Sequence, residues 1–159
     1  MSLRKEALTD EWYREYINPP ICDLIIKMNK LPFIRTISSC GGHYSLDDCS
    51  MDHLGIMFFV DKDNNEGRKF IAELKETLKD YPFVHLKLPY EKSSLPQYDI
   101  EADWFEFPEL RSKSKDEKKA FLEEMFNQTY GRLNTGLENF VEGWLKKEDV
   151  VNDLSLAGS

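Results

Sequence analysis

The apolar run LGIMFFV at residues 54–60 constrains the fold more than any other stretch of the sequence. A continuous apolar segment of this length is typical of a strand in the middle of a sheet. A helical pattern precedes it, because Ile21, Leu24, Ile25 and Met28 follow the i, i+3, i+4, i+7 spacing of one buried stripe. The sequence therefore combines at least one amphipathic helix with a central strand.

The other patterns complete an α+β domain. Further strands are predicted at residues 33–38, 83–88 and 98–107. Two pairs with capping-box spacing predict helix starts, Asp63 with Glu66 and Ser114 with Glu117. The second pair begins a long helical tract, which could break at Gly131 and Gly136. We expect a single domain over residues 1–150, with helices packed on a mixed or antiparallel sheet and a long C-terminal helical tract, and a flexible tail at 151–159.

The composition fits one domain that works in the cytoplasm. The chain has 159 residues, and 41% of them are hydrophobic, which is enough for a core. No apolar run approaches the roughly 20 residues of a membrane span, and the first residues lack the apolar stretch of a signal peptide, so we expect no membrane partner. The net charge of −8 disfavours a dedicated duplex-binding domain. Three cysteines are too few for a disulfide scaffold.

Residues 35–53, RTISSCGGHYSLDDCSMDH, hold two of the three cysteines and two of the three histidines. We expect the preceding strand to end in a turn at Gly41 and Gly42, because glycine accepts positive φ and lets the backbone approach closely. The amides of such a turn could bind an anion, with the hydroxyls of Ser38 and Ser39 beside them. Arg35 could add positive charge to this ligand site, although strand alternation would place it on the other face from Ser38, so an anion could bind with or without it. An ordinary tight turn is the simpler interpretation of the glycine pair.

The same stretch offers candidate catalytic groups. His43 is of the type that carries protons near neutral pH. Cys40 could act as a nucleophile if the amides of the turn or the imidazole activated its thiol, and Ser39 is the competing nucleophile. No G-x-S-x-G motif supports a hydrolase triad.

A metal site is the alternative for this stretch. Four residues could bind zinc: Cys40, His43, Cys49 and His53. The five residues that separate the two pairs are fewer than the roughly 12 of common zinc modules. Three carboxylates could substitute as ligands: Asp47, Asp48 and Asp52. Buried or unreactive thiols remain the alternative.

Residues 22–43 resemble the beginning of the wybutosine-synthesising tRNA methyltransferase family. That family has an apolar helix, an Asn and a strand that ends in Thr-x-Ser-Ser-Cys-Ser-Gly-Arg, and the matching positions here are Asn29, Thr36, Ser38, Ser39, Cys40 and Gly42. Gly41 stands where the family has Ser, and His43 stands where it has Arg, which removes a permanently charged fork. The stretch is also similar to a Ser-Cys-x-Gly-His turn in small uncharacterised prokaryotic proteins.

The resemblance implies a two-layer domain that uses S-adenosylmethionine and acts on a tRNA base. The leading hypothesis is therefore a methyltransferase-like domain with a ligand pocket around residues 38–43. The second is a binding module stabilised by zinc at Cys40, His43, Cys49 and His53. The third is a protein-interaction domain in which the stretch is only a turn.

Overall fold

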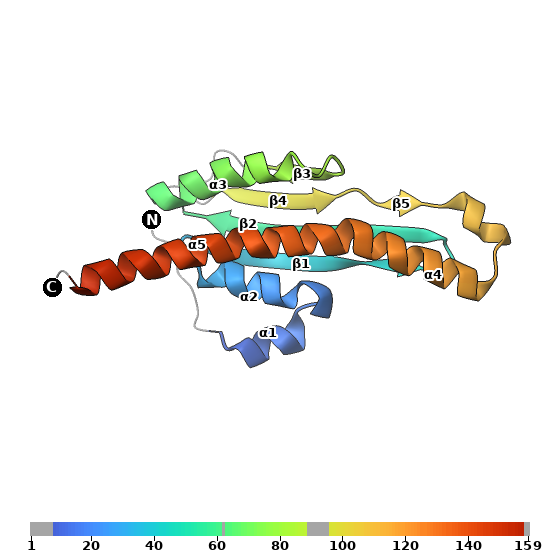
Figure 1. Cartoon of the computed structure of the whole chain (residues 1–159), viewed down its shortest axis with the longest axis horizontal. Helices are drawn as coiled ribbons and strands as arrows, with labels where there is room; N and C mark the ends of the chain where they lie inside the picture. The colour runs from blue at the N-terminus through green and yellow to red at the C-terminus, as the bar shows by residue number, and fades with distance from the viewer. Residues whose placement is uncertain (1–7, 62, 89–95, 158–159) are drawn as a thin grey trace.

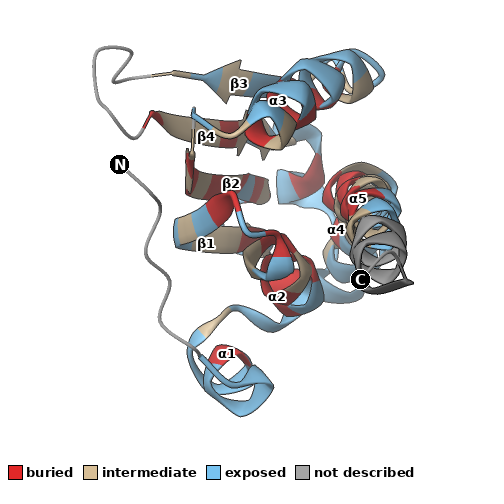
Figure 2. Ribbon diagram, turned by 90° about the vertical axis from the view of Figure 1, so that its left-hand side faces the viewer, coloured by how far each residue is buried: buried red, intermediate tan, exposed pale blue. Residues whose placement is uncertain are grey.

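A computed structural model describes residues 8–61, 63–88 and 96–157, with side chains up to residue 148. It confirms a single α+β domain, in which helices pack on one face of an antiparallel sheet (Figures 1 and 2). The helices are α1 (Asp10–Tyr16), α2 (Cys22–Lys30), α3 (Asn65–Leu78), α4 (Lys115–Phe126) and α5 (Arg132–Ala157). The strands are β1 (Ile34–Ser45), β2 (Ser50–Val60), β3 (Val84–Lys87), β4 (Gln97–Ala102) and β5 (Phe105–Glu106).

The predicted central strand is confirmed. The sheet order is β1-β2-β4-β3, and β5 pairs with the other end of β2. Alternate residues of β2 face the helices and are buried: Leu54, Ile56, Phe58 and Val60. Met57 and Phe59 lie on the opposite face and are only half-buried. The helices α2, α3, α4 and α5 lie on one side of the sheet, and no described helix covers the other face, which we call the open face (Figure 2).

The prediction of a turn at the glycine pair, Gly41 and Gly42, is wrong. β1 continues to Ser45, and the pairing of Cys40 with Gly55 and of Gly41 with Leu54 runs on without interruption. The hairpin turns instead at residues 46–49. The Ser45 hydroxyl accepts a hydrogen bond from the Asp48 amide there at 3.1 Å, which is the side-chain turn chemistry that serine offers.

A β-bulge at Ile37 changes which side chains of β1 share a face. Thr36 pairs with Phe58 and Ser38 pairs with Met57, so Ile37 has no partner of its own on β2. Because of this extra residue, Ser39 lies on the same face as Thr36. Ser38 is turned to the opposite face, although it is the direct neighbour of Ser39.

The helix starts follow the sequence closely. The Ser114 hydroxyl accepts from the Glu117 amide, as the capping pattern predicts. The start of α3 is capped by Asn64 instead of Asp63, with the Asn64 carboxamide oxygen accepting from the Glu66 and Gly67 amides. The long tract bends through a π-helical turn at Asn127–Gly131, and α5 then runs to Ala157, so residues 151–157 are helical.

One hydrophobic core joins the sheet to the helices. Its aromatic centre is formed by Phe33, Phe70, Phe140 and Trp144, whose ring centroids lie 5.1–5.8 Å apart where they touch. Such tilted and edge-to-face contacts add to the burial of apolar area. Within the ranges that the structure describes, no helix is long and apolar enough to cross a membrane.

The ion pairs of Lys27 link α2 to α5 and should make stability depend on pH. The Lys27 Nζ lies 2.5 Å from both Glu138 Oε1 and Glu142 Oε1. The hydrogen bond to Glu138 raises the pKa of Lys27, and the hydrogen bond from Lys27 lowers the pKa of Glu142. The Glu142 carboxylate, whose pKa is lowered, contributes stability above its unfolded pKa, and this stability is lost as the pH falls through its folded pKa. The Lys27 ammonium, whose pKa is raised, contributes stability below its unfolded pKa, and this stability is lost as the pH rises through its folded pKa.

We expect Lys27→Met to lower the melting temperature most between about pH 5 and pH 10, with a difference from wild type that disappears in stronger acid. Melting curves across this pH range test the prediction. Lys79→Met is the control, because its pair with Glu76 is exposed on the surface and should contribute little at any pH. If Lys27→Met lowered the melting temperature by the same amount at pH 3, the effect could not come from the ion pairs with Glu138 and Glu142.

Candidate functional site

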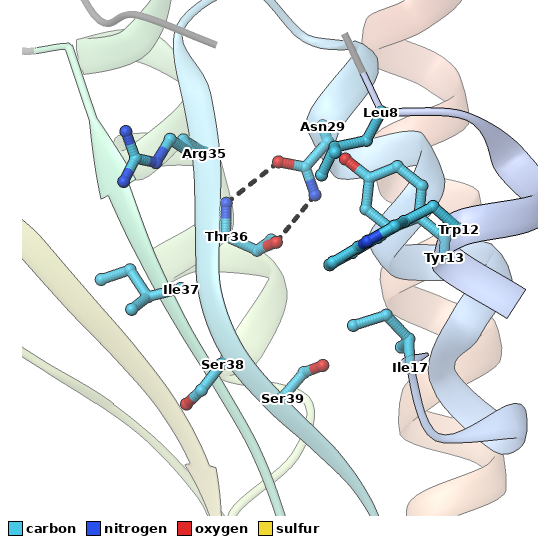
Figure 3. A pocket seen from close by; sticks show the side chains of 10 residues that line it. All are labelled: Leu8, Trp12, Tyr13, Ile17, Asn29, Arg35, Thr36, Ile37, Ser38 and Ser39. Carbon is cyan, nitrogen blue, oxygen red and sulfur yellow. Dashed lines mark hydrogen bonds between the residues drawn. The ribbon is translucent and has the colours of Figure 1, made fainter. Parts of the chain in front are cut away.

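A pocket of about 250 Å³ lies between α1 and the outer edge of β1 (Figure 3). β1 is at the end of the sheet order among the described strands, so this edge is not covered by another strand. The pocket is lined by Leu8, Trp12, Tyr13, Ile17, Asn29, Arg35, Thr36, Ile37, Ser38 and Ser39. It therefore combines an apolar wall from the N-terminal segment with a polar wall from α2 and β1.

The apolar wall is built by α1. Thr9 caps this short helix by accepting a hydrogen bond from the Trp12 amide at 3.1 Å. Trp12 and Tyr13 meet edge to face, with ring centroids 5.4 Å apart. Tyr13 is buried, and its burial is the main reason why its pKa is raised. The indole of Trp12 is 38% exposed, so an aromatic surface remains accessible at the pocket.

The polar wall is fixed by Asn29. Its carboxamide nitrogen donates to the Thr36 hydroxyl at 2.7 Å and to the Ile25 carbonyl at 2.9 Å. Its carboxamide oxygen accepts from the Thr36 amide at 3.1 Å. One side chain thus bonds the end of α2 to the edge of β1 and satisfies a backbone amide that has no strand beside it.

Ser39 is a polar group of this wall whose hydroxyl has no partner within the described part of the chain. Its side chain points toward α1 (Figure 3), and its hydroxyl oxygen is buried without a hydrogen bond to any described residue. A buried hydroxyl in this condition is costly unless a ligand or water pairs with it. Ser38 points to the opposite side of β1 (Figure 3), where its hydroxyl donates to the Met57 sulfur at 3.3 Å.

Arg35 also faces away from the pocket interior. Its guanidinium lies 5.8 Å from the centre of the Phe59 ring on the open face of the sheet. Arg35 and Ser38 pair with Phe59 and Met57, two residues apart on β2, so they share a face. The expectation that strand alternation separates Arg35 from Ser38 is therefore wrong, because the bulge at Ile37 inserts an extra residue between them.

The predicted catalytic groups do not gather at this pocket. Neither Cys40 nor His43 lines it. Cys40 is half-buried and lies opposite Gly55. His43 is exposed, and its Nε2 lies 3.1 Å from Asp52 Oδ2 on the neighbouring strand. Ser39 is the one predicted catalytic residue at the pocket.

The two glycines serve close packing and do not form a turn. A Cβ on Gly41 would lie 2.7 Å from Asn18 Oδ1 and 3.1 Å from Pro20 Cβ. A Cβ on Gly42 would lie 2.7 Å from Tyr130 Cδ2. Gly42 does have the positive φ that was expected, at 83°. Side chains from the helical layer fill the space where an anion was expected to bind.

The four predicted zinc ligands are not brought together. Cys49 is buried at the hairpin turn, with its sulfur 3.6 Å from the Leu46 carbonyl. His43 and His53 are exposed, and both contact the Asp52 carboxylate, at 3.1 and 3.5 Å. Among the residues that the structure describes, no three His, Cys, Asp or Glu side chains are arranged to hold a metal. The residues present do not fit a zinc ion.

The sequence did not point to the wall formed by α1. Trp12, Tyr13 and Ile17 contribute to the site from a position more than 15 residues before Thr36. The segment shows only a short capped helix in the sequence, and nothing in its pattern indicates which part of the sheet it covers. Asn29 is different, because the family resemblance already marked it.

Comparisons with known proteins support the fold alone. No protein-family model matches the chain, and no curated protein matches its sequence. Among solved structures, the chain is similar to the structure of PH1069 protein from Pyrococcus horikoshii, with a TM-score of 0.51 and 12% sequence identity. The match covers 82% of this chain and 85% of that one. At this identity the likeness shows a shared fold and says nothing of activity.

Proposed function

We propose that this chain is a methyltransferase-like domain that binds S-adenosylmethionine in the pocket between α1 and β1 and acts on an RNA base. The observation that carries the proposal is the buried Ser39 hydroxyl, which has no hydrogen-bond partner among the described residues, in a pocket with an accessible indole. The family resemblance supports it independently, because three of the matching residues, Asn29, Thr36 and Ser39, line this pocket on the side of α1. A cytoplasmic location is part of the same proposal.

The pocket fits one part of the cofactor better than the whole. Its volume of about 250 Å³ is just below the usual range for small-molecule sites, so the adenosyl half is the part that it would enclose. The Trp12 indole would stack on the purine, and the Ser39 hydroxyl would hydrogen-bond to a ring nitrogen or a ribose hydroxyl. When bound, the cofactor supplies an electrophilic methyl group. The chain binds it and orients it, and the Asn29–Thr36 bonds keep that wall rigid.

Calorimetric titration with S-adenosylmethionine tests the proposal. We expect the wild-type chain to bind, and we expect Ser39→Ala to raise the Kd roughly tenfold, because one buried hydrogen bond contributes about 1 kcal/mol or slightly more. Ser38→Ala is the matched control, since it removes the same hydroxyl from the opposite side of β1. It should leave the Kd unchanged.

Two results would reject the assignment. Absence of a heat signal at millimolar cofactor would reject S-adenosylmethionine as the ligand. Equal weakening by Ser38→Ala and Ser39→Ala would show that the ligand does not occupy the pocket beside α1. His43→Ala should also leave binding unchanged, because His43 does not line the pocket.

A further inference from the structure

The second edge of the sheet, at β3, has backbone groups that no described strand occupies. β3 pairs with β4 and with no other described strand. The Phe83 carbonyl accepts a hydrogen bond from the Asp103 amide at 2.8 Å. This bond shows which residues of β3 direct their backbone groups toward β4. In an antiparallel pair every second residue directs its amide and carbonyl to the neighbouring strand. His85 and Lys87 therefore point these groups at β4, and the Val84 carbonyl and the Leu86 amide and carbonyl point outward.

A groove runs beside this edge, between β3 and α3. Its lining includes the apolar residues Leu78, Tyr81, Val84 and Leu86. Leu78 and Val84 are buried and form part of the hydrophobic core. α3 lies against β3 on the helical side of the sheet (Figures 1 and 2). An added strand at this edge would therefore have an apolar wall under every second side chain.

The charge of the groove points to the kind of partner. Lys75 lies in the last turn of α3 and Lys79 is the residue that caps its C-terminal end, and both line the groove. Among the described residues, no acidic side chain lines the groove, although the whole chain carries a net charge of −8. Lys79 contacts Glu76 at 2.7 Å, but Glu76 lies outside the lining. A local basic rim on an acidic chain favours an acidic partner.

We infer that the groove binds an extended peptide segment, which adds to β3 as a further strand. In this binding mode main-chain hydrogen bonds supply affinity and alternate side-chain sites supply specificity. The peptide pairs with the outward groups of Val84 and Leu86, inserts alternate apolar side chains toward Leu78, and places acidic residues beside Lys75 and Lys79. A second copy of the chain fits less well, since β3 pairing with β3 would bring the lysines of both copies to the same side.

Two labelled synthetic peptides test the inference by fluorescence anisotropy. The first alternates valine with glutamate over ten residues, and the second has lysine in place of each glutamate. We expect the acidic peptide to bind and the basic peptide to bind at least tenfold more weakly. Reversing the charge of Lys75 and Lys79 to glutamate should invert this preference. Both side chains are exposed, so the domain should still fold. Lys69→Glu is the matched control, because Lys69 is an exposed lysine of α3 that does not line the groove.

A backbone variant separates strand addition from simple charge attraction. Leu86→Pro removes an amide that points away from β4, and an edge strand tolerates proline at such a position. It should abolish binding, whereas Leu86→Val should retain it within about threefold. Equal binding of the two peptides, no binding of the acidic peptide at millimolar concentration, or an unchanged affinity of Leu86→Pro would overturn the inference. None of these results depends on the pocket beside α1.

Discussion

Replacing Gly42 by alanine is expected to lower the free energy of unfolding by about 3 kcal/mol. The residue has a φ of 83°, which disfavours any side chain. The new Cβ would also lie 2.7 Å from Tyr130 Cδ2 and 3.2 Å from the Asp52 carbonyl oxygen. The Tyr130 ring cannot move easily, because it is buried and its hydroxyl donates to the Asp103 carbonyl at 2.5 Å. Burial also raises the pKa of Tyr130, so the phenol stays neutral and keeps this hydrogen bond.

Urea unfolding measures this effect, and Gly143→Ala is the control. Gly143 lies within α5, and a Cβ there would meet no atom within 4 Å. Alanine should therefore raise the free energy of unfolding by about 0.5–1 kcal/mol, because it favours the helical backbone. If Gly42→Ala did not lower the free energy of unfolding, the close approach of Gly42 to Tyr130 would be contradicted.

The second large effect is expected for Phe70→Ala, which should lower the free energy of unfolding by about 4 kcal/mol. Phe70 is 1% exposed, and its ring centroid lies 5.6 Å from that of Phe33, 5.1 Å from that of Phe140 and 5.7 Å from that of Trp144. Truncation would leave a cavity where α3, α5 and the segment before β1 meet. The surrounding aromatic rings are too rigid to fill it.

Phe59→Ala is the control for the same loss of a phenyl ring. Phe59 lies on the open face of the sheet and is only half-buried beneath Arg35. We expect it to cost about 1–2 kcal/mol, since less area returns to water and no closed cavity forms. Urea unfolding measures both losses, and the m-values should stay the same because the variants change stability without changing the surface exposed on unfolding. Equal losses for the two variants would show that the covered and open faces of the sheet are assigned wrongly.

The order of helices and strands follows from local patterns in the sequence. The central strand, the amphipathic stripe of α2 and the cap at Ser114 are each specified by residues close together in the chain, and each is confirmed. The predicted hairpin turn lies too early in the chain, because the glycine pair is a strong turn signal in the sequence but lies within β1. Ser45 and Asp48 carry the turn chemistry that is used.

The site depends on contacts that local patterns do not encode. Gly42 has positive φ as expected, yet the reason is the approach of Tyr130, which lies almost 90 residues further along the chain. The bulge at Ile37 has no glycine or proline to mark it, and it decides that Ser39 faces the pocket and Ser38 does not. The covering of the β1 edge by α1 is likewise a tertiary contact without a signature in the sequence.

A crystal structure of the chain soaked with S-adenosylmethionine tests the central claim most directly. The bulge at Ile37 is expected to leave the Ser39 hydroxyl as the first polar contact of a ligand that lies against Trp12. Ligand density between α1 and β1, within hydrogen-bonding distance of Ser39 Oγ, is the predicted result. Density on the open face beside Cys40 and His53, or an empty pocket at millimolar cofactor, would contradict it.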